Sequence, residues 1–145
     1  MDQDTMVIAQ TDSGKRLIEL LGPEGFPVSA AFWAKPTEEG KWFLYLASPV
    51  VDEVGSTASY RIVHRVIRGA PDLWIDPFEV KVIGAHSSLA IEAIEATKPK
   101  APTSAFAVQN GKPYPGMTRF GGSTLGGVSV DGAFIYPPPQ PAVPA

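Results

Sequence analysis

The chain has 145 residues, of which 44% are hydrophobic and 19% charged, and its formal net charge is −3. These values are typical of one globular domain and exclude wholesale disorder and a coiled coil. The absence of cysteine excludes disulfides, thiolate metal ligands and thiol nucleophiles.

The first residues predict a protein without a targeting segment. Asp2 and Asp4 stand where a secretory signal would carry positive charge, and no apolar stretch of the needed length is present. The longest nearly continuous apolar run, residues 42–47, is far shorter than the roughly 20 residues of a membrane-spanning helix. We therefore expect a soluble, cytoplasmic protein that does not contact a membrane.

Leucine spacing predicts an amphipathic helix that ends near Leu21, where Gly22 and Pro23 stop it. Its beginning is open between two possibilities. Residues 6–8 either extend the helix upstream past Gly14 or form a short strand before a turn.

Two strands are expected next. Residues 27–35 alternate in side-chain character, whereas residues 41–47 are apolar on both faces, which is typical of a central strand. Residues 36–40 suit a hairpin loop between them. Because alternation places Phe32 opposite Trp33, one of these rings faces either solvent or a second layer.

The one concentrated chemical feature is a basic helix over residues 57–68, which a loop after Ser48-Pro49 precedes and Gly69 ends. Advancing by about 100° per residue separates an aliphatic side from a basic side. The aliphatic side holds Ile62, Val63, Val66 and Ile67, and the basic side holds Arg61, His64, Arg65 and Arg68.

This basic side has two interpretations. It is either a solvated surface, with Glu92 or Glu95 of a neighbouring helix as ionic partners, or an anion- or partner-binding face. The second interpretation uses the planar guanidinium group, which binds carboxylate or phosphate through two parallel hydrogen bonds.

Each of the two histidines has two interpretations. His64 is either a surface residue or a neutral donor or acceptor beside the arginines. His86 follows a strand and precedes a helix, where α/β folds often place ligands, although a loop histidine is the plainer interpretation. A zinc site joining both with Asp76 or Glu79 lacks paired-ligand spacing, so neither a metal nor another cofactor is predicted.

Alternation over residues 78–82 predicts a half-buried strand, and Ser87 or Ser88 suits the N-cap of a helix running to about Thr97. Leu89, Ala93 and Ile94 would face inward, with Glu92 and Glu95 outward. Residues 98–102 form a connector.

The last part of the chain combines short β-prone runs with glycine pairs. The runs are residues 118–120, 128–130 and 133–136, and Asp131-Gly132 and Asn110-Gly111 are tight-turn signals. The stretch from Gly121 to Gly127 does not match a phosphate loop or a nucleophile elbow, which favours turn or bulge glycines. A proline-rich tail, predicted to be unfolded, follows, so the domain is expected at 1–136 and the tail at 137–145.

Residues 30–67 and 117–137 resemble a family of small, uncharacterised bacterial proteins. In that family an aliphatic-aromatic strand precedes a tryptophan-led strand that ends in Ala-Ser-Pro, as at residues 47–49, and a glycine-containing strand precedes an aromatic ending. The chain departs from this pattern at Gly132, where an acidic residue is usual. The resemblance implies a single α+β domain and no particular activity.

Together these patterns predict a single α+β domain with a mixed or mainly antiparallel sheet of five or six strands and two or three packed helices. Because no catalytic constellation is complete, the leading hypothesis is a non-catalytic protein-interaction module or a subunit of a larger assembly. It would bind protein, either itself or another subunit, through Arg61, Arg65 and Arg68, together with sheet edges or exposed aromatics. The alternatives are a nucleic-acid-binding accessory protein of weak affinity and an enzyme acting on an anionic small molecule near His64.

Overall fold

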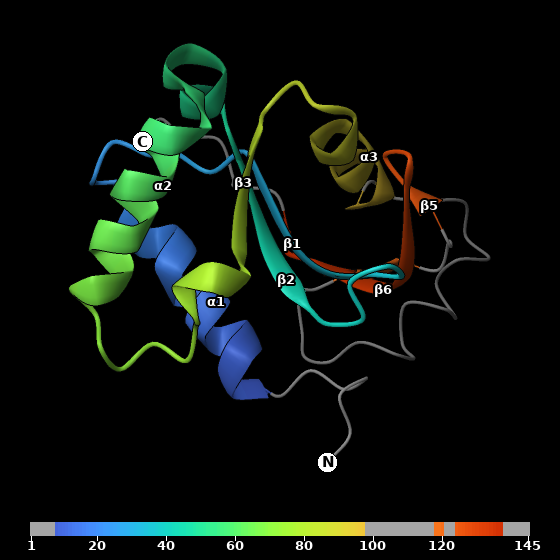
Figure 1. Ribbon diagram of the computed structural model, residues 1–145, viewed down its shortest axis with the longest axis horizontal. Helices are drawn as coiled ribbons and strands as arrows, with labels where there is room; N and C mark the ends of the chain where they lie inside the picture. The colour runs from blue at the N-terminus through green and yellow to red at the C-terminus, as the bar shows by residue number, and fades with distance from the viewer. Residues whose placement is uncertain (1–7, 98–117, 121–123, 138–145) are drawn as a thin grey trace, which may run out of the picture.

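The computed structural model describes residues 8–97, 118–120 and 124–137, which form one sheet with helices on both of its faces (Figure 1). The elements are α1 (Ile8–Leu21), β1 (Ala30–Pro36), β2 (Phe43–Ser48), α2 (Pro49–Arg68), a 3-10 turn (Pro77–Glu79), β3 (Val80–Gly84), α3 (Ser88–Thr97), β4 (Thr118–Phe120), β5 (Thr124–Leu125) and β6 (Val128–Ile135). The predicted α+β class is therefore confirmed.

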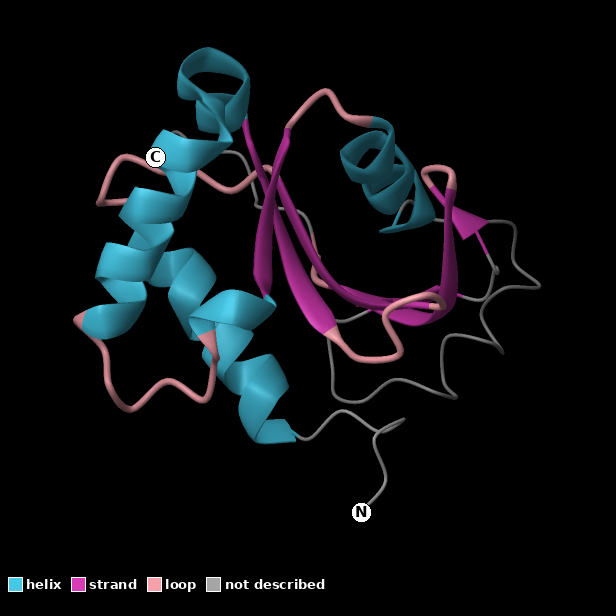
Figure 2. Cartoon of the chain, viewed as in Figure 1, coloured by secondary structure: helices cyan, strands magenta, loops and turns pink. Residues whose placement is uncertain are grey.

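The sheet is mixed, with strand order β3-β2-β1-β6-β4. Figure 2 shows the strands in magenta between the helices in cyan. The predicted hairpin joins β1 to β2 in antiparallel fashion, and β2 lies inside the sheet as expected. Because α2 crosses from the end of β2 to the start of β3, these two strands run parallel. β6 returns antiparallel beside β1, and the short β5 pairs with the first residues of β6.

Two helical layers bury the two faces of the sheet. Trp33 packs in one cluster with residues of α1 and α2, while Phe32 packs in another with α3 and the β5–β6 hairpin. Both aromatic side chains are 0% exposed. Neither ring faces solvent, because a helical layer covers each face of the sheet. Among the helices of the described ranges, none combines the length and apolarity needed to span a bilayer.

Helix α1 continues through Gly14, which settles the open question at its beginning in favour of a helix from Ile8 onward. Residues 1–7 lie outside the described residues. A Cβ at Gly14 would overlap the hydroxyl of Tyr136, so the glycine allows α1 to approach the sheet at this point.

The loop predicted after Ser48 and Pro49 is wrong, because α2 begins at Pro49. Ser48 caps the helix by accepting a hydrogen bond from the Val50 N–H at 3.1 Å, and proline at the first position needs no N–H partner. Gly55, with φ +86°, then kinks α2 and separates its first turns from the segment that carries the arginines.

The tight turn predicted at Asp131-Gly132 is also wrong. Both residues lie within β6, where Lys35 pairs with Gly132 and Pro36 with Val130, so Asp131 is the extra residue of a bulge. The actual turn lies at Gly126-Gly127, between the paired residues of β5 and β6, with φ values of 58° and 87°. A hairpin turn with positive φ at both central residues strongly favours glycine.

At the other ends of elements, one prediction is wrong and one open choice is settled. Phe78 lies in the 3-10 turn before β3 rather than in the strand, because Asp76 accepts a hydrogen bond from its N–H and Pro77 follows the cap. The N-cap of α3 is Ser87, whose hydroxyl accepts from the Ala90 N–H. The predicted connector at 98–102, the turn at Asn110-Gly111 and the tail from 138 lie outside the described residues.

Candidate functional site

The basic helix forms as predicted, and its arginines share the solvent side. Arg61, Arg65 and Arg68 are exposed, whereas Val63 and Ile67 are buried against α1 and the sheet. We call these three residues the arginine ridge. Their spacing of three to four residues aligns the guanidinium groups along one side of the helix.

Two of the three guanidinium groups have no acidic partner within the described part of the chain. Arg65 lies 3.9 Å from the Glu24 carboxylate, and both side chains are more than half exposed, so the pair contributes little to stability. Arg61 and Arg68 form no ion pair with another described residue. The expected pairing with Glu92 or Glu95 does not form, because α3 packs on the opposite face of the sheet (Figure 1).

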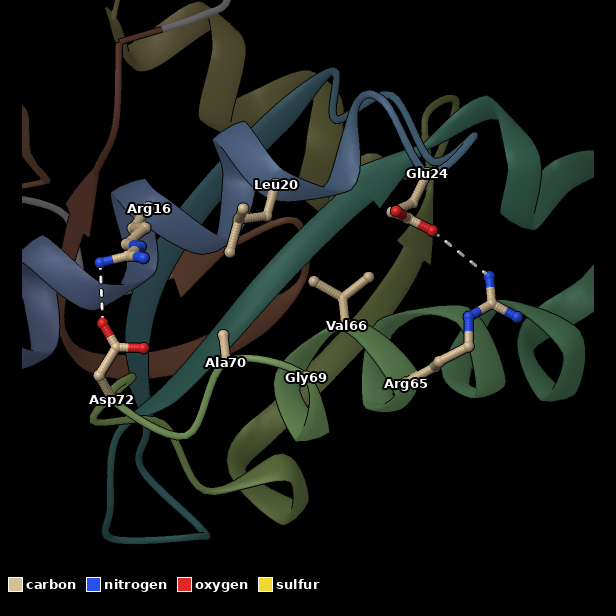
Figure 3. Close-up of a pocket in the computed structure, with 8 residues that line it drawn as sticks. All are labelled: Arg16, Leu20, Glu24, Arg65, Val66, Gly69, Ala70 and Asp72. Carbon is tan, nitrogen blue, oxygen red and sulfur yellow. Dashed lines mark hydrogen bonds and ion pairs between the residues drawn. The ribbon is translucent and has the colours of Figure 1, made fainter.

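A groove of about 380 Å³ runs beside the ridge, between α1, the C-terminal half of α2 and the loop that follows it. Figure 3 shows an ion pair at each end, Arg16–Asp72 at 2.8 Å and Arg65–Glu24. The side chains of Leu20, Val66 and Ala70 lie between the two pairs. The groove therefore combines an apolar floor with charges of both signs at its ends.

His64 is half-buried rather than on the open surface. Its ring lies 5.7 Å from the Tyr60 ring, and its Nε2 is enclosed without a hydrogen-bond partner among the described residues. An enclosed Nε2 is poorly placed to exchange a proton with a ligand held by the exposed arginines. His64 therefore lies on the same helix as the arginines. It is not part of the exposed surface that Arg61, Arg65 and Arg68 form.

His86 lies beside Asp52, a residue in the segment that the sequence predicted to be a loop. The Asp52 carboxylate accepts a hydrogen bond from the Ala85 N–H at 2.9 Å and lies 3.4 Å from His86 Nδ1. The parallel pairing of β2 and β3 brings the start of α2 and the turn after β3 to the same edge of the sheet. A Cβ at Gly84 would overlap the Asp52 carboxylate, so glycine permits the approach.

The Asp52–His86 pair is exposed, with 85% of the His86 side chain accessible, and Asp52 can orient the imidazole through Nδ1. The hydroxyls of Ser48 and Ser87 on either side are already engaged as helix N-caps. Within the described residues, no group of three His, Asp or Glu side chains is arranged to hold a metal ion. The pair alone supports no particular reaction.

Two exposed aromatic side chains come shortly after Asp72, the last groove-lining residue in the sequence. Trp74 is 68% and Phe78 is 85% exposed. Their backbone is held in place, because Ser13 Oγ accepts from the Trp74 N–H and Asp76 from the Phe78 N–H, each at 2.9 Å. No local sequence pattern distinguishes Trp74 from a buried tryptophan.

In comparisons with protein-family models, curated protein sequences and solved structures, nothing matches this chain. The resemblance to small bacterial α+β proteins therefore stays a prediction.

Proposed function

We propose that the protein is a non-catalytic interaction module that docks an acidic segment of a partner protein along the arginine ridge and its groove. The observation that carries this proposal is the pair of exposed guanidinium groups, Arg61 and Arg68, that have no acidic partner among the described residues. A partner carboxylate would supply the bidentate hydrogen bonds that these groups lack.

The groove supports a peptide-like partner. Its apolar floor, formed by Leu20, Val66 and Ala70, offers a contact for an aliphatic or aromatic anchor. Trp74, which follows the groove-lining Asp72 in the chain, adds a large exposed aromatic on a tethered backbone. Exposed tryptophan and arginine are the residue types that most often dominate interface energetics.

The same geometry disfavours the two alternatives. Three arginine–phosphate contacts give a salt slope of only about −2.7, so the nucleic-acid affinity of the ridge would be weak, and a phosphate backbone has no group that fills the apolar floor of the groove. A peptide can instead carry apolar groups and charges of both signs. At His64 the Nε2 is enclosed, so this nitrogen is poorly placed to exchange a proton with a ligand on the arginine ridge.

The partner is another protein or a second copy of this chain within a larger assembly. We also propose, from the sequence, that the protein is cytoplasmic and that it belongs to a bacterial family.

A binding titration tests the proposal directly. Labelled peptides of about 15 residues would carry Glu at helical i, i+4, i+7 spacing with Leu or Phe between them. Fluorescence anisotropy would compare wild type with the double variant Arg61→Ala/Arg68→Ala. Loss of two charge-assisted contacts should weaken binding by about tenfold.

The control variant Lys15→Ala/Lys41→Ala removes the same charge from two exposed lysines that do not line the groove, and it should bind like wild type. Peptides with Lys in place of Glu should not bind. Equal binding by the arginine variant would contradict the proposal, as would tighter binding of single-stranded RNA or duplex DNA at about 50 mM salt. Absence of peptide binding together with a monomer in sedimentation analysis would also end it.

A further inference from the structure

A second pocket, of about 480 Å³, lies on the sheet face that α3 covers, opposite the arginine ridge. It opens between the β1–β2 loop, the N-terminal end of α3 and the turn that joins β5 to β6. Its walls include Leu89 and Val128, and its polar groups come from Glu38, Glu39, Tyr45, Lys81 and Ser129. These residues are far apart in the sequence, and only the sheet brings them together.

Tyr45 supplies an unused hydrogen-bond donor to this pocket. The residue is 5% exposed, and its ring stacks on Phe32 with centroids 4.9 Å apart. Its hydroxyl has no hydrogen-bond partner among the described residues. Burial raises the pKa of this hydroxyl above the ordinary value of 10.0, and the nearby Glu39 carboxylate and Tyr60 raise it further. The phenol therefore stays protonated and can donate to a ligand.

Lys81 places a cation beside that donor. It is the register partner of Tyr45 in the parallel β2–β3 pair, so the two side chains project from the same face of the sheet. Its Nζ lies 4.3 Å from the centroid of the Phe43 ring and 5.8 Å from that of Tyr45. An ammonium group and a phenolic hydroxyl on adjacent strands form a pair of donors that suits a carboxylate.

Two carboxylates, Glu38 and Glu39, also line the pocket. Glu39 lies 3.8 Å from Lys81 Nζ, whereas Glu38 has no ionic partner within the described residues. With two acids and one base, the pocket carries an excess of negative charge. A ligand that neutralises it must bring a positive group, and a ligand that satisfies Tyr45 must bring an acceptor.

We propose that this pocket binds a free α-amino acid. The ligand carboxylate accepts hydrogen bonds from the Tyr45 hydroxyl and the Lys81 ammonium, and the ligand ammonium lies against Glu38 and Glu39. Leu89 and Val128 contact the ligand side chain. A simple amine would leave the Tyr45 donor unsatisfied, and a simple carboxylic acid would face two like charges. This site goes beyond the proposed docking function, because the two surfaces lie on opposite faces of the sheet.

Isothermal titration calorimetry and thermal-shift assays with each standard amino acid, at up to about 10 mM, test the proposal. At least one amino acid should bind and raise the melting temperature. For that amino acid, the analogue without the carboxylate and the analogue without the ammonium should each bind about tenfold more weakly. Absence of binding by every amino acid would overturn the proposal, as would equal binding of the matching amine.

Three variants identify the binding groups. Tyr45→Phe keeps the stacked ring and removes only the donor, while Lys81→Met and Glu38→Gln each remove one charge. Each should weaken binding on the order of tenfold. Glu53→Gln, in an exposed position on α2, is the matched control for Glu38→Gln and should bind like wild type. Unchanged binding in both Tyr45→Phe and Lys81→Met would overturn the assignment.

A spectroscopic titration of wild type keeps the test independent of variant folding. At pH 7, where the ligand keeps its ammonium group, a carboxylate that accepts from the Tyr45 hydroxyl should shift the near-ultraviolet absorbance of this phenol. The difference signal should be missing in Tyr45→Phe. A near-ultraviolet absorbance that the bound amino acid leaves unchanged would place the ligand elsewhere and contradict the proposal.

Discussion

Tyr136 ties helix α1 to the sheet through a chain of buried hydrogen bonds. Trp33 Nε1 donates to the Tyr136 hydroxyl at 3.0 Å, and that hydroxyl donates to the Thr11 carbonyl at 2.5 Å. All three residues are buried. The geometry requires close approach of α1, and Gly14 leaves the space for the hydroxyl. A glycine that reads as a turn signal in the sequence is therefore a packing position.

The variant Gly14→Ala should destabilise the protein by about 1–3 kcal/mol, because its methyl group overlaps the Tyr136 hydroxyl in a packed interior. Helix propensity alone predicts the opposite sign, since alanine is the better helix former by about 1 kcal/mol. Urea unfolding of wild type and variant measures the difference.

Gly22→Ala is the matched control for this measurement. A Cβ at Gly22 meets no atom within 4 Å, so the free energy of unfolding should change by less than about 0.5 kcal/mol. A Gly14→Ala variant as stable as wild type would show that α1 can move away from the sheet without cost.

At the scale of elements, α2 consists of two helical segments that Gly55 separates. Its first turns are fixed by the Ser48 cap and by the hydrogen bond between Asp52 and the Ala85 N–H. The second segment carries the arginine ridge and packs on α1 and β3. Gly55 has φ +86° and ψ 171°, a conformation open essentially only to glycine. The kink thus sets the direction of the ridge.

The variant Gly55→Ala should lower the free energy of unfolding by about 1–3 kcal/mol. The cause is backbone strain alone, because a Cβ at this position meets no atom within 4 Å. Chemical denaturation measures the loss, and Gly22→Ala again serves as the control. Retained stability with increased helicity in circular dichroism would contradict the prediction and would indicate that α2 straightens.

Local signals predicted elements well where side-chain periodicity was long. The basic segment and the β1–β2 hairpin follow from such periodicity. Single dipeptide signals failed, because Asp131-Gly132 pairs with β1 as a bulge instead of turning. The start of α2 was missed although Ser48 and Pro49 are standard cap residues, since Gly55 interrupts the helical pattern after them.

At the scale of the whole molecule, stability should be greatest in the middle of the sheet. β1 is hydrogen-bonded to strands on both sides, and both of its faces are covered by helices. β3 lies at an edge, where the Tyr60 hydroxyl accepts from the Val82 N–H at 3.3 Å. The loop after α2 carries exposed residues.

Native-state hydrogen exchange should therefore show the slowest exchange in β1 and β2 and the fastest in the 69–76 loop. The slowest amides should open only with global unfolding, whereas the loop amides open locally at a small free-energy cost. Mass spectrometry of exchanged fragments measures both. Protection of the loop equal to that of β1 would contradict this gradient.

The sequence predicted one of the candidate sites in part and missed the other. The arginine ridge was predictable, because its three residues lie on one helix and helical geometry relates them directly. The groove beside it was not, since Glu24 and Asp72 belong to other segments of the chain. Tyr45 and Lys81 lie side by side only through the parallel pairing of β2 and β3, which no local pattern specifies.

The amino-acid sequence by itself determined the class of fold, the main helices and strands, and the side of α2 that carries positive charge, because each follows from side-chain order over a few neighbouring residues. The tertiary structure alone decided that Trp33 and Phe32 face two separate helical layers, and that Gly14 is a contact rather than a turn. It also decided which acidic side chains lie beside which basic side chains. The physical reason is that contacts between distant segments depend on strand order and crossover connections, and these are settled by burial of the whole chain.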